Sequence, residues 1–107
     1  MSRITVGAVS KLPPGSLVQV EVNGREYAVC NAGGKVHVLD GTCPHAGGPI
    51  GHGALHGNMI VCPWHAWEFD CRTGENDYDA AIRVETYAVH IEGDEIQIET
   101  DPSAGTS

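Results

Sequence analysis

The segment VQVEVNGREYAVCNAGGKVHVL, residues 18–39, decides the fold class. Its first five residues place valine at every second position, which is the period-two pattern of a strand with one buried face. Asn23-Gly24 is the dipeptide that favours a tight type I′ hairpin turn, and residues 25–30 form the returning strand. Gly33-Gly34 makes a second turn, and residues 35–39 form a third strand. The segment therefore predicts an antiparallel meander.

The same hairpin pattern recurs near the C-terminus. Apolar and polar residues alternate over 89–91 and again over 96–98, with a turn around Gly93-Asp94 between them. Residues 40–80 are instead rich in Gly, Pro, His and aromatic residues. The short strand candidates in this region are residues 59–61 and 67–70. We therefore predict an all-β fold in which a scaffold of strands holds a site in the middle of the chain.

The length of 107 residues is close to the common size of one domain. We predict a single domain over residues 1–107, in which the small polar residues 101–107 form a flexible tail. No apolar stretch approaches the roughly 18 residues of a membrane-spanning helix. Met1–Thr5 is not followed by the apolar segment of a signal peptide, so a cytoplasmic location is expected.

The charge is negative and unevenly distributed. Six Lys and Arg against fourteen Asp and Glu give a formal charge of −8, which argues against nucleic acid and membrane as partners. Residues 1–67 carry a net charge of +1, whereas residues 68–107 carry −9. This acidic C-terminal part is either a solubilising surface or a docking surface for a basic partner.

Two Cys/His pairs form the constellation that carries chemistry. They are Cys43-Pro44-His45 and Cys62-Pro63-Trp64-His65, separated by sixteen residues, and both lie in segments without periodicity. Thiolates suit iron–sulfur irons and zinc, and neutral imidazole suits iron or zinc. Each pair begins with Cys-Pro, and proline stiffens a loop by fixing its own backbone torsion. The four candidate metal ligands are Cys43, His45, Cys62 and His65.

The pair of motifs resembles the Rieske family, in which one iron of a [2Fe-2S] cluster is bound by two Cys and the other by two His. The resemblance spans most of residues 4–99 and implies a Rieske-like antiparallel β-sandwich or barrel with a small cluster-binding subdomain at about 41–72. The further matching motifs are Leu12-Pro13-Pro14-Gly15, Gly47-Gly48-Pro49-Ile50, Gly53-Ala54-Leu55-His56-Gly57, Trp67-Glu68-Phe69-Asp70 and Thr73-Gly74.

The resemblance also implies a role for each candidate ligand. Cys43 and Cys62 would bind the inner ferric iron, and His45 and His65 the outer iron that changes valence. Two neutral imidazoles in place of two thiolates remove two negative charges from the ligand set, which makes reduction easier than in all-Cys clusters. The implied cofactor is a Rieske-type [2Fe-2S] cluster, and the implied function is one-electron transfer.

The sequence departs from the respiratory branch of the family at four positions. That branch has two further cysteines, joined as a disulfide, at positions matching Gly48 and Trp64, and hydroxyl side chains at positions matching Trp67 and Phe69. Without those hydroxyl donors the reduced cluster is less stabilised. We therefore predict a reduction potential near the low end of the Rieske range, about −150 mV.

A low-potential, stand-alone Rieske protein resembles the ferredoxin component of bacterial ring-hydroxylating oxygenase systems. The implied partners are a flavin-containing NAD(P)H ferredoxin reductase and a terminal oxygenase. Oxygenase subunits of such systems also hold a mononuclear iron by two His and a carboxylate, but His90 is the only histidine after His65. We therefore expect an electron carrier and not an enzyme.

Two alternatives remain for the Cys/His set and its function. Structural zinc also takes two Cys and two His, although zinc fingers usually pair like residues within one loop. The small subunit of an assimilatory nitrite reductase, which docks on a sirohaem-containing large subunit, resembles the same fold.

The remaining Cys, His and Trp residues are predicted to be mainly structural. Cys30 and Cys71 are expected to be buried small side chains, with a mutual disulfide or a redox role as the alternative. The glycines around His52 and His56 argue against a helical metal pair. His37 and His90 are expected to be structural or solvent-facing. Trp64 and Trp67 are expected to pack in the core, to shield the metal, or to do both.

Overall fold

The computed structural model describes residues 2–42, 48–63, 67–76, 79 and 81–100. Their strands pair antiparallel throughout, which confirms the all-β prediction. The elements in chain order are β1 (Ser2–Ala8), η1 (Val9–Lys11), β2 (Leu17–Val22), β3 (Arg25–Ala32), β4 (Lys35–Asp40), η2 (Ile50–His52), β5 (Ala54–His56), β6 (Met59–Val61), β7 (Glu68–Asp70), β8 (Thr86–Tyr87), β9 (Val89–Glu92) and β10 (Glu95–Thr100).

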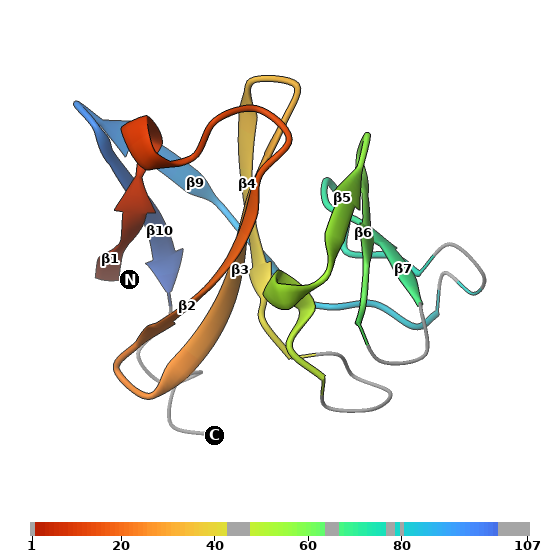
Figure 1. Ribbon diagram of the computed structural model, residues 1–107. Coiled ribbons are helices and arrows are strands. Elements are labelled where there is room, and N and C mark those ends of the chain that lie inside the picture. The colour runs from red at the N-terminus through yellow and green to blue at the C-terminus, as the bar shows by residue number, and fades with distance from the viewer. Residues whose placement is uncertain (1, 43–47, 64–66, 77–78, 80, 101–107) are drawn as a thin grey trace.

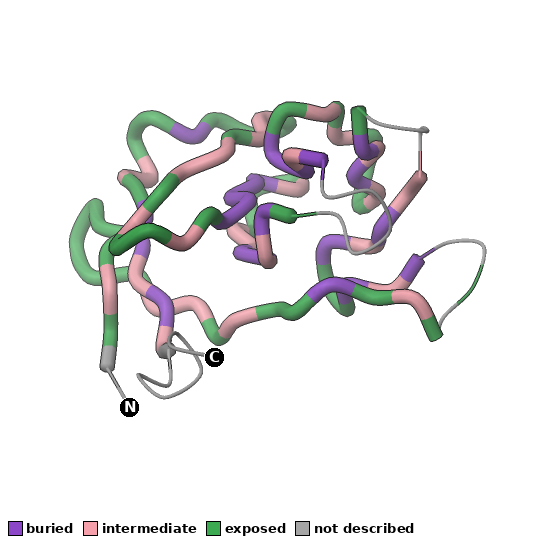
Figure 2. The backbone as a smooth tube through the Cα atoms, turned by 90° about the horizontal axis from the view of Figure 1, so that it is seen from below, coloured by how far each residue is buried: buried purple, intermediate pink, exposed green. Residues whose placement is uncertain are grey.

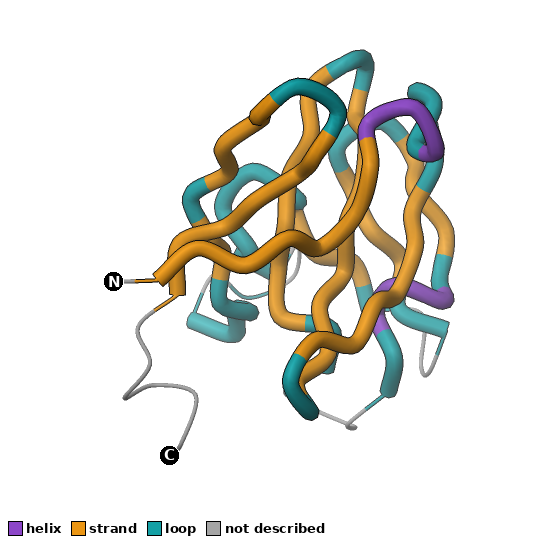
Figure 3. Tube along the Cα trace, turned by 90° about the vertical axis from the view of Figure 1, so that its left-hand side faces the viewer, coloured by secondary structure: helices purple, strands orange, loops and turns teal. Residues whose placement is uncertain are grey.

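The strands form three sheets that lie side by side in Figure 1. The outer sheet has the order β1-β10-β9, the central sheet β2-β3-β4-β8 and the small sheet β5-β6-β7. The two 3-10 helices are short connections at the ends of strands, as Figure 3 shows. No helix among the described residues is long and apolar enough to cross a membrane.

The central meander follows the sequence prediction closely. Asn23 and Gly24 have φ angles of 55° and 80°, and Val22 pairs with Arg25 across them, so this turn has the positive φ values that a type I′ turn requires. Gly33 and Gly34 have φ angles of 64° and 98° at the second turn. The turn chemistry therefore sets the register of all three strands.

The central sheet is covered on both faces, so the molecule has two hydrophobic cores. Residues 27–30 of β3 belong alternately to one core and then the other, so the strand is buried on both faces. Figure 2 shows the buried segments of the chain in purple. The outer core, against the outer sheet, contains Val6, Leu12, Tyr27, Val29, Val38, Ile96 and Ile98. The inner core, against the small sheet, contains Ala28, Cys30, Leu39, Ile50, Ile60, Cys62, Phe69, Cys71 and Val84.

Three strands were not predicted from the sequence. Strand β1 does alternate: Ile4, Val6 and Ala8 are less exposed than the residues between them, and its register shift between Thr5 and Gly7 leaves this alternation intact. Strands β5 and β8 have three and two residues, too few to show a period. The small sheet lies within the segment 41–72 that the resemblance assigns to cluster binding, whose boundaries stay a prediction. The expected tail 101–107 lies outside the described residues.

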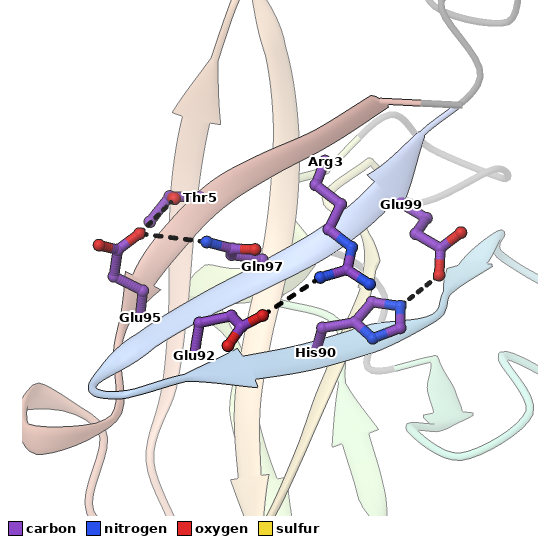
Figure 4. A network of polar contacts seen from close by, with 7 residues as sticks. All are labelled: Arg3, Thr5, His90, Glu92, Glu95, Gln97 and Glu99. Atoms are coloured by element: carbon purple, nitrogen blue, oxygen red, sulfur yellow. Dashed lines mark hydrogen bonds and ion pairs between the residues drawn. The ribbon is translucent and has the colours of Figure 1, made fainter.

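The exposed face of the outer sheet carries polar contacts between its strands (Figure 4). Arg3 Nη1 lies 3.5 Å from Glu92 Oε1, and Thr5 Oγ1 donates to Glu95 Oε1 at 3.0 Å. His90 on β9 contacts Glu99 on β10, which makes His90 a partly buried cross-strand partner. The outer sheet stands on the opposite side of the central sheet from the small sheet (Figure 1).

Candidate metal centre

Of the four candidate ligands, Cys62 is the one within the described part of the chain. It follows β6 directly, and its side chain is 1% exposed in the inner core. Cys43, His45 and His65 lie outside the described residues, as does Trp64. The site is therefore described through the loop bases, which are the described residues at the ends of the two segments that carry these candidate ligands.

The first segment begins and ends at one place beside the central sheet. Thr42 and Pro49 form an antiparallel bridge, and the Ile50 N–H donates to the Gly41 carbonyl oxygen at 2.9 Å. The Gly41 N–H donates in turn to the Glu26 carbonyl oxygen at 3.0 Å, next to β3 residues of the central sheet. The described residues on both sides of the segment that carries Cys43 and His45 are therefore held together beside this sheet.

The second segment is a hairpin connection between β6 and β7. Val61 pairs with Glu68, and inside that pair the Cys62 N–H donates to the Trp67 carbonyl oxygen at 2.7 Å. Trp67 is half-buried and packs against the inner core. These contacts hold the backbone of Cys62 at the start of the loop that carries His65.

The two loop bases pack on the same buried inner core, which forms a platform for both. Ile50, which follows the first loop, and Cys62 belong to the same inner core. Gly53 lies so close to β6 that a Cβ built on it would come within 1.8 Å of the Val61 carbonyl oxygen. Glycine at this position lets the chain after the first loop pack directly on the strand that leads to Cys62.

A soft metal fits the donor set at this platform. A cysteine sulfur held in an apolar interior beside two anchored loops meets the requirement of an iron–sulfur site for a thiolate ligand shielded from water. The hydroxyl-bearing positions of the respiratory branch are occupied here by Trp67 and by Phe69, which is fully buried in the inner core. Neither side chain has an oxygen to donate a hydrogen bond to sulfur.

A family model of the Rieske [2Fe-2S] domain matches residues 2–88. The chain is a Rieske [2Fe-2S] domain. The ferredoxin component of the naphthalene 1,2-dioxygenase system of Pseudomonas aeruginosa is 32% identical to it over 93 residues, which cover 86% of this chain and 89% of that protein. The ferredoxin of carbazole 1,9a-dioxygenase from Nocardioides aromaticivorans IC177 has a TM-score of 0.84 at 29% identity, over 94% of this chain and 100% of that one.

Its cofactor is therefore a Rieske-type [2Fe-2S] cluster, and this Rieske domain is an electron carrier of the ferredoxin type and not a catalyst. The zinc alternative is set aside by the same family match. The putative NADH-dependent nitrite reductase small subunit from Mycobacterium tuberculosis has a TM-score of 0.82 at 23% identity, over 94% of this chain and 96% of that one. That likeness shows a shared fold.

Cys30 and Cys71 of the Rieske domain are both buried, as predicted. Their thiols are free and in hydrogen-bond contact with each other inside the inner core. The contact with Cys71, together with burial, raises the pKa of the Cys30 thiol well above its ordinary value. Both side chains pack in the inner core between the central sheet and the end of β7.

The remaining histidines are separate from one another. His52 ends η2 and His56 ends β5, and both are exposed. His37 lies on the central sheet, where burial and then the charge of Lys35 lower its pKa. Among the residues with described positions, no group of three or more His, Cys, Asp and Glu side chains is arranged to hold a metal ion.

Sequence reasoning missed the residues that hold the loop bases. They are the close-packed glycines at 41, 51 and 53, the buried Asn76 and the side chain of Gln19. The alternation of β2 gives Gln19 the same polar position as Glu21, so no local signal separates the two. Their roles depend on contacts with segments that are distant in sequence.

Proposed function

We propose that this Rieske domain carries single electrons from an NAD(P)H-dependent flavin reductase to a terminal oxygenase that hydroxylates an aromatic ring. The observation that carries the proposal is the likeness to a ferredoxin component over 89% of that protein's length, with the same fold as a dioxygenase ferredoxin. The described residues next to both ligand segments, such as Ile50 and Cys62, belong to the inner core on one side of the central sheet.

The ligand assignment is part of this proposal. Cys43 and Cys62 bind the inner iron, and His45 and His65 bind the outer iron. The buried position of Cys62 supports its assignment to the inner iron, because a thiolate in an apolar platform is shielded from water and proton donors. When bound, the cluster accepts and releases one electron at the imidazole-bound iron. The protein's own contribution is to hold the four side chains in place through the two loop bases.

The negative charge of the chain favours docking with partners that have basic surfaces. The formal charge is −8, and exposed carboxylates such as Glu85, Glu92 and Glu95 belong to the acidic part after residue 67. Such a surface steers a basic partner to the domain by long-range attraction, which salt screens. A shuttle that meets a reductase and an oxygenase in turn benefits from fast, weak docking. We place this exchange in the cytoplasm, where NAD(P)H is available.

The first experiment tests the cluster and its ligands. Protein purified anaerobically is analysed for iron and acid-labile sulfide, and its reduction potential is measured by voltammetry, with an expected value of about −150 mV. Cys62→Ser and His45→Cys should abolish or alter the visible spectrum. His52→Ala is the matched control, because His52 is exposed and lies outside both ligand loops. Parent protein without iron and sulfide, or with a clearly positive potential, would contradict the proposal.

The second experiment tests the partners. NADH, a flavin ferredoxin reductase and an aromatic-ring dioxygenase are combined with the Rieske domain, and hydroxylated product is measured at rising salt. We expect turnover that depends on the domain and falls as salt increases. The nitrite reductase alternative rests on the shared fold. Stable co-purification with a sirohaem protein, and no turnover with the reductase and oxygenase, would favour that alternative instead.

A further inference from the structure

The side chain of Gln19 connects both ends of the first ligand loop. Its Nε2 donates to the Gly41 carbonyl oxygen at 2.9 Å, just before the loop. Its Oε1 accepts a hydrogen bond from the Gly51 N–H at 2.7 Å, just after the loop. One amide group on β2 therefore bridges two backbone segments that are ten residues apart in sequence.

The packing around these contacts leaves little room for movement. A Cβ on Gly51 would come within 2.6 Å of the Gln19 Cα, and a Cβ on Gly41 within 2.7 Å of Gln19 Nε2. Both distances are shorter than real side-chain contacts allow, so glycine at each position lets the loop ends lie directly against β2 and β3. Both glycines are themselves buried.

We propose that Gln19 is a positioning residue for the redox centre: its amide ties the two ends of the loop that carries Cys43 and His45 and fixes how that loop is presented. The inference rests on the proposed ligand assignment for its redox consequence. The hydrogen bonds themselves are independent of that assignment.

The contacts at Gly41 and Gly51 require a side chain that both donates and accepts a hydrogen bond, which a primary amide does. The side chain must donate to a carbonyl oxygen at Gly41 and accept from an N–H at Gly51, and glutamine has both groups on one planar unit. The second Nε2 hydrogen donates to Glu26 Oε1 at 2.9 Å, which fixes the orientation of the amide. A glutamate at this position would keep the acceptor but would place a carboxylate against a carbonyl oxygen and the Glu26 carboxylate.

The central test compares Gln19→Leu with the parent holoprotein. Leucine is similar in volume and removes both loop contacts. Hydrogen exchange at the Gly51 amide, whose acceptor is lost, should accelerate about tenfold, and the cluster should be lost to an iron chelator about tenfold faster. The EPR spectrum of the reduced protein should broaden, because a loosened loop samples several geometries. Gln19→Glu keeps an acceptor for the Gly51 N–H but loses the donor to the Gly41 carbonyl oxygen, so it should also broaden the EPR spectrum and speed cluster loss, with Gly51 exchange closer to that of the parent.

Three controls separate positioning from a general loss of stability. Gln97→Leu removes a glutamine on β10 whose side chain contacts Glu95 on the outer sheet. Glu26→Gln keeps a side-chain oxygen for Nε2 and both loop contacts. Ile98→Val weakens the outer core without touching the loop. All three should leave the EPR linewidth and the Gly51 exchange rate close to those of the parent.

The outcomes distinguish this inference from the proposed function. Unchanged Gly51 exchange in Gln19→Leu would overturn the inference, whether or not the parent binds iron. Faster exchange with unchanged EPR spectrum and chelation rate would make Gln19 merely structural and would also overturn it. A parent protein that lacks iron and sulfide would refute the proposed function and the redox role of Gln19, while the exchange experiment would still measure the loop contact.

Discussion

The outer and inner cores are held together in different ways. Apart from Leu12, the outer core consists of side chains from regular strands on two facing sheets, such as Val29 and Ile98, which are 1% and 0% exposed. The inner core also contains residues that follow or connect strands, including Ile50, Cys62 and Cys71. Irregular backbone around it is fixed by amide side chains and close-packed glycines.

The difference between the two cores reflects the position of the ligand loops, which lie next to the inner core in sequence. A core between two regular sheets needs only apolar side chains at every second position. A core beneath ligand loops must also satisfy the backbone groups that those loops leave unpaired, because a buried N–H or C=O without a partner is costly. Strand β3 contributes side chains to both cores.

The largest expected effect compares Phe69→Ala in the inner core with Ile98→Ala in the outer core. Both side chains are fully buried. Phe69→Ala should lower the free energy of unfolding by about 3–5 kcal/mol and Ile98→Ala by about 2–5 kcal/mol, because each leaves a cavity. Urea unfolding and iron analysis measure both effects. Only Phe69→Ala should reduce the iron bound per folded molecule, and equal iron loss in both variants would erase the functional distinction between the cores.

The second comparison replaces one glycine near each core by alanine, Gly53 next to the small sheet and Gly7 on the outer sheet. A Cβ on Gly53 would lie 1.8 Å from the Val61 carbonyl oxygen, whereas one on Gly7 would lie 3.9 Å from the Ile96 Cδ1 atom, an ordinary contact. Gly53→Ala should cost about 1–3 kcal/mol of unfolding free energy, and Gly7→Ala should change it by less than about 1 kcal/mol. Thermal unfolding of both variants checks the prediction. A neutral Gly53→Ala would mean that the loop base tolerates a backbone shift.

The third comparison uses two buried asparagines. Asn76 donates from Nδ2 to the Glu68 carbonyl oxygen at 3.0 Å, and Asn31 donates from Nδ2 to the Leu12 carbonyl oxygen at 2.8 Å. Replacing either by Ala leaves a backbone group without its partner and should cost about 1–3 kcal/mol. Urea unfolding should give similar values for both, and chelator-driven iron loss should accelerate in Asn76→Ala alone. Faster iron loss in Asn31→Ala would contradict this separation.

The smallest expected effect is a change in the pKa values of two carboxyl groups, one near each end of the molecule's set of sheets. Hydrogen bonds from the Arg72 side chain lower the pKa of Asp70 beside the small sheet, and hydrogen bonds from Ser10 lower that of Asp94 beside the outer sheet. A lowered pKa in the folded state stabilises the protein above the unfolded-state value of about 3.9, and this contribution is lost as pH falls through the folded-state value.

Arg72→Gln and Ser10→Ala should therefore each raise the pKa of their own carboxyl partner toward its ordinary value. NMR titration of the two aspartates measures both changes directly. The stability of each variant should approach that of the parent as pH falls through the lowered folded-state pKa of its aspartate. A variant that moves the pKa of the other aspartate would indicate coupling between the two sides of the molecule.

The regular half of the fold could be predicted from the sequence. Asn23-Gly24 and Gly33-Gly34 fixed the central hairpins because their positive φ angles suit the twist of paired strands. The hairpin of β9 and β10 followed from its alternating isoleucines. Strand β8 could not be predicted because two residues show no period, whereas β1 has the alternating pattern of a strand and could have been predicted from it.

The Cys/His motifs themselves were sufficient to identify the family and its cofactor, because ligand type and spacing are local properties of the chain. The tertiary structure alone decided that Gln19 meets Gly41 and Gly51 and that Gly53 rests on Val61. The physical reason is that such contacts join residues 8 to 32 positions apart in the chain, whose approach is determined by packing of the whole fold and by no pattern within either segment.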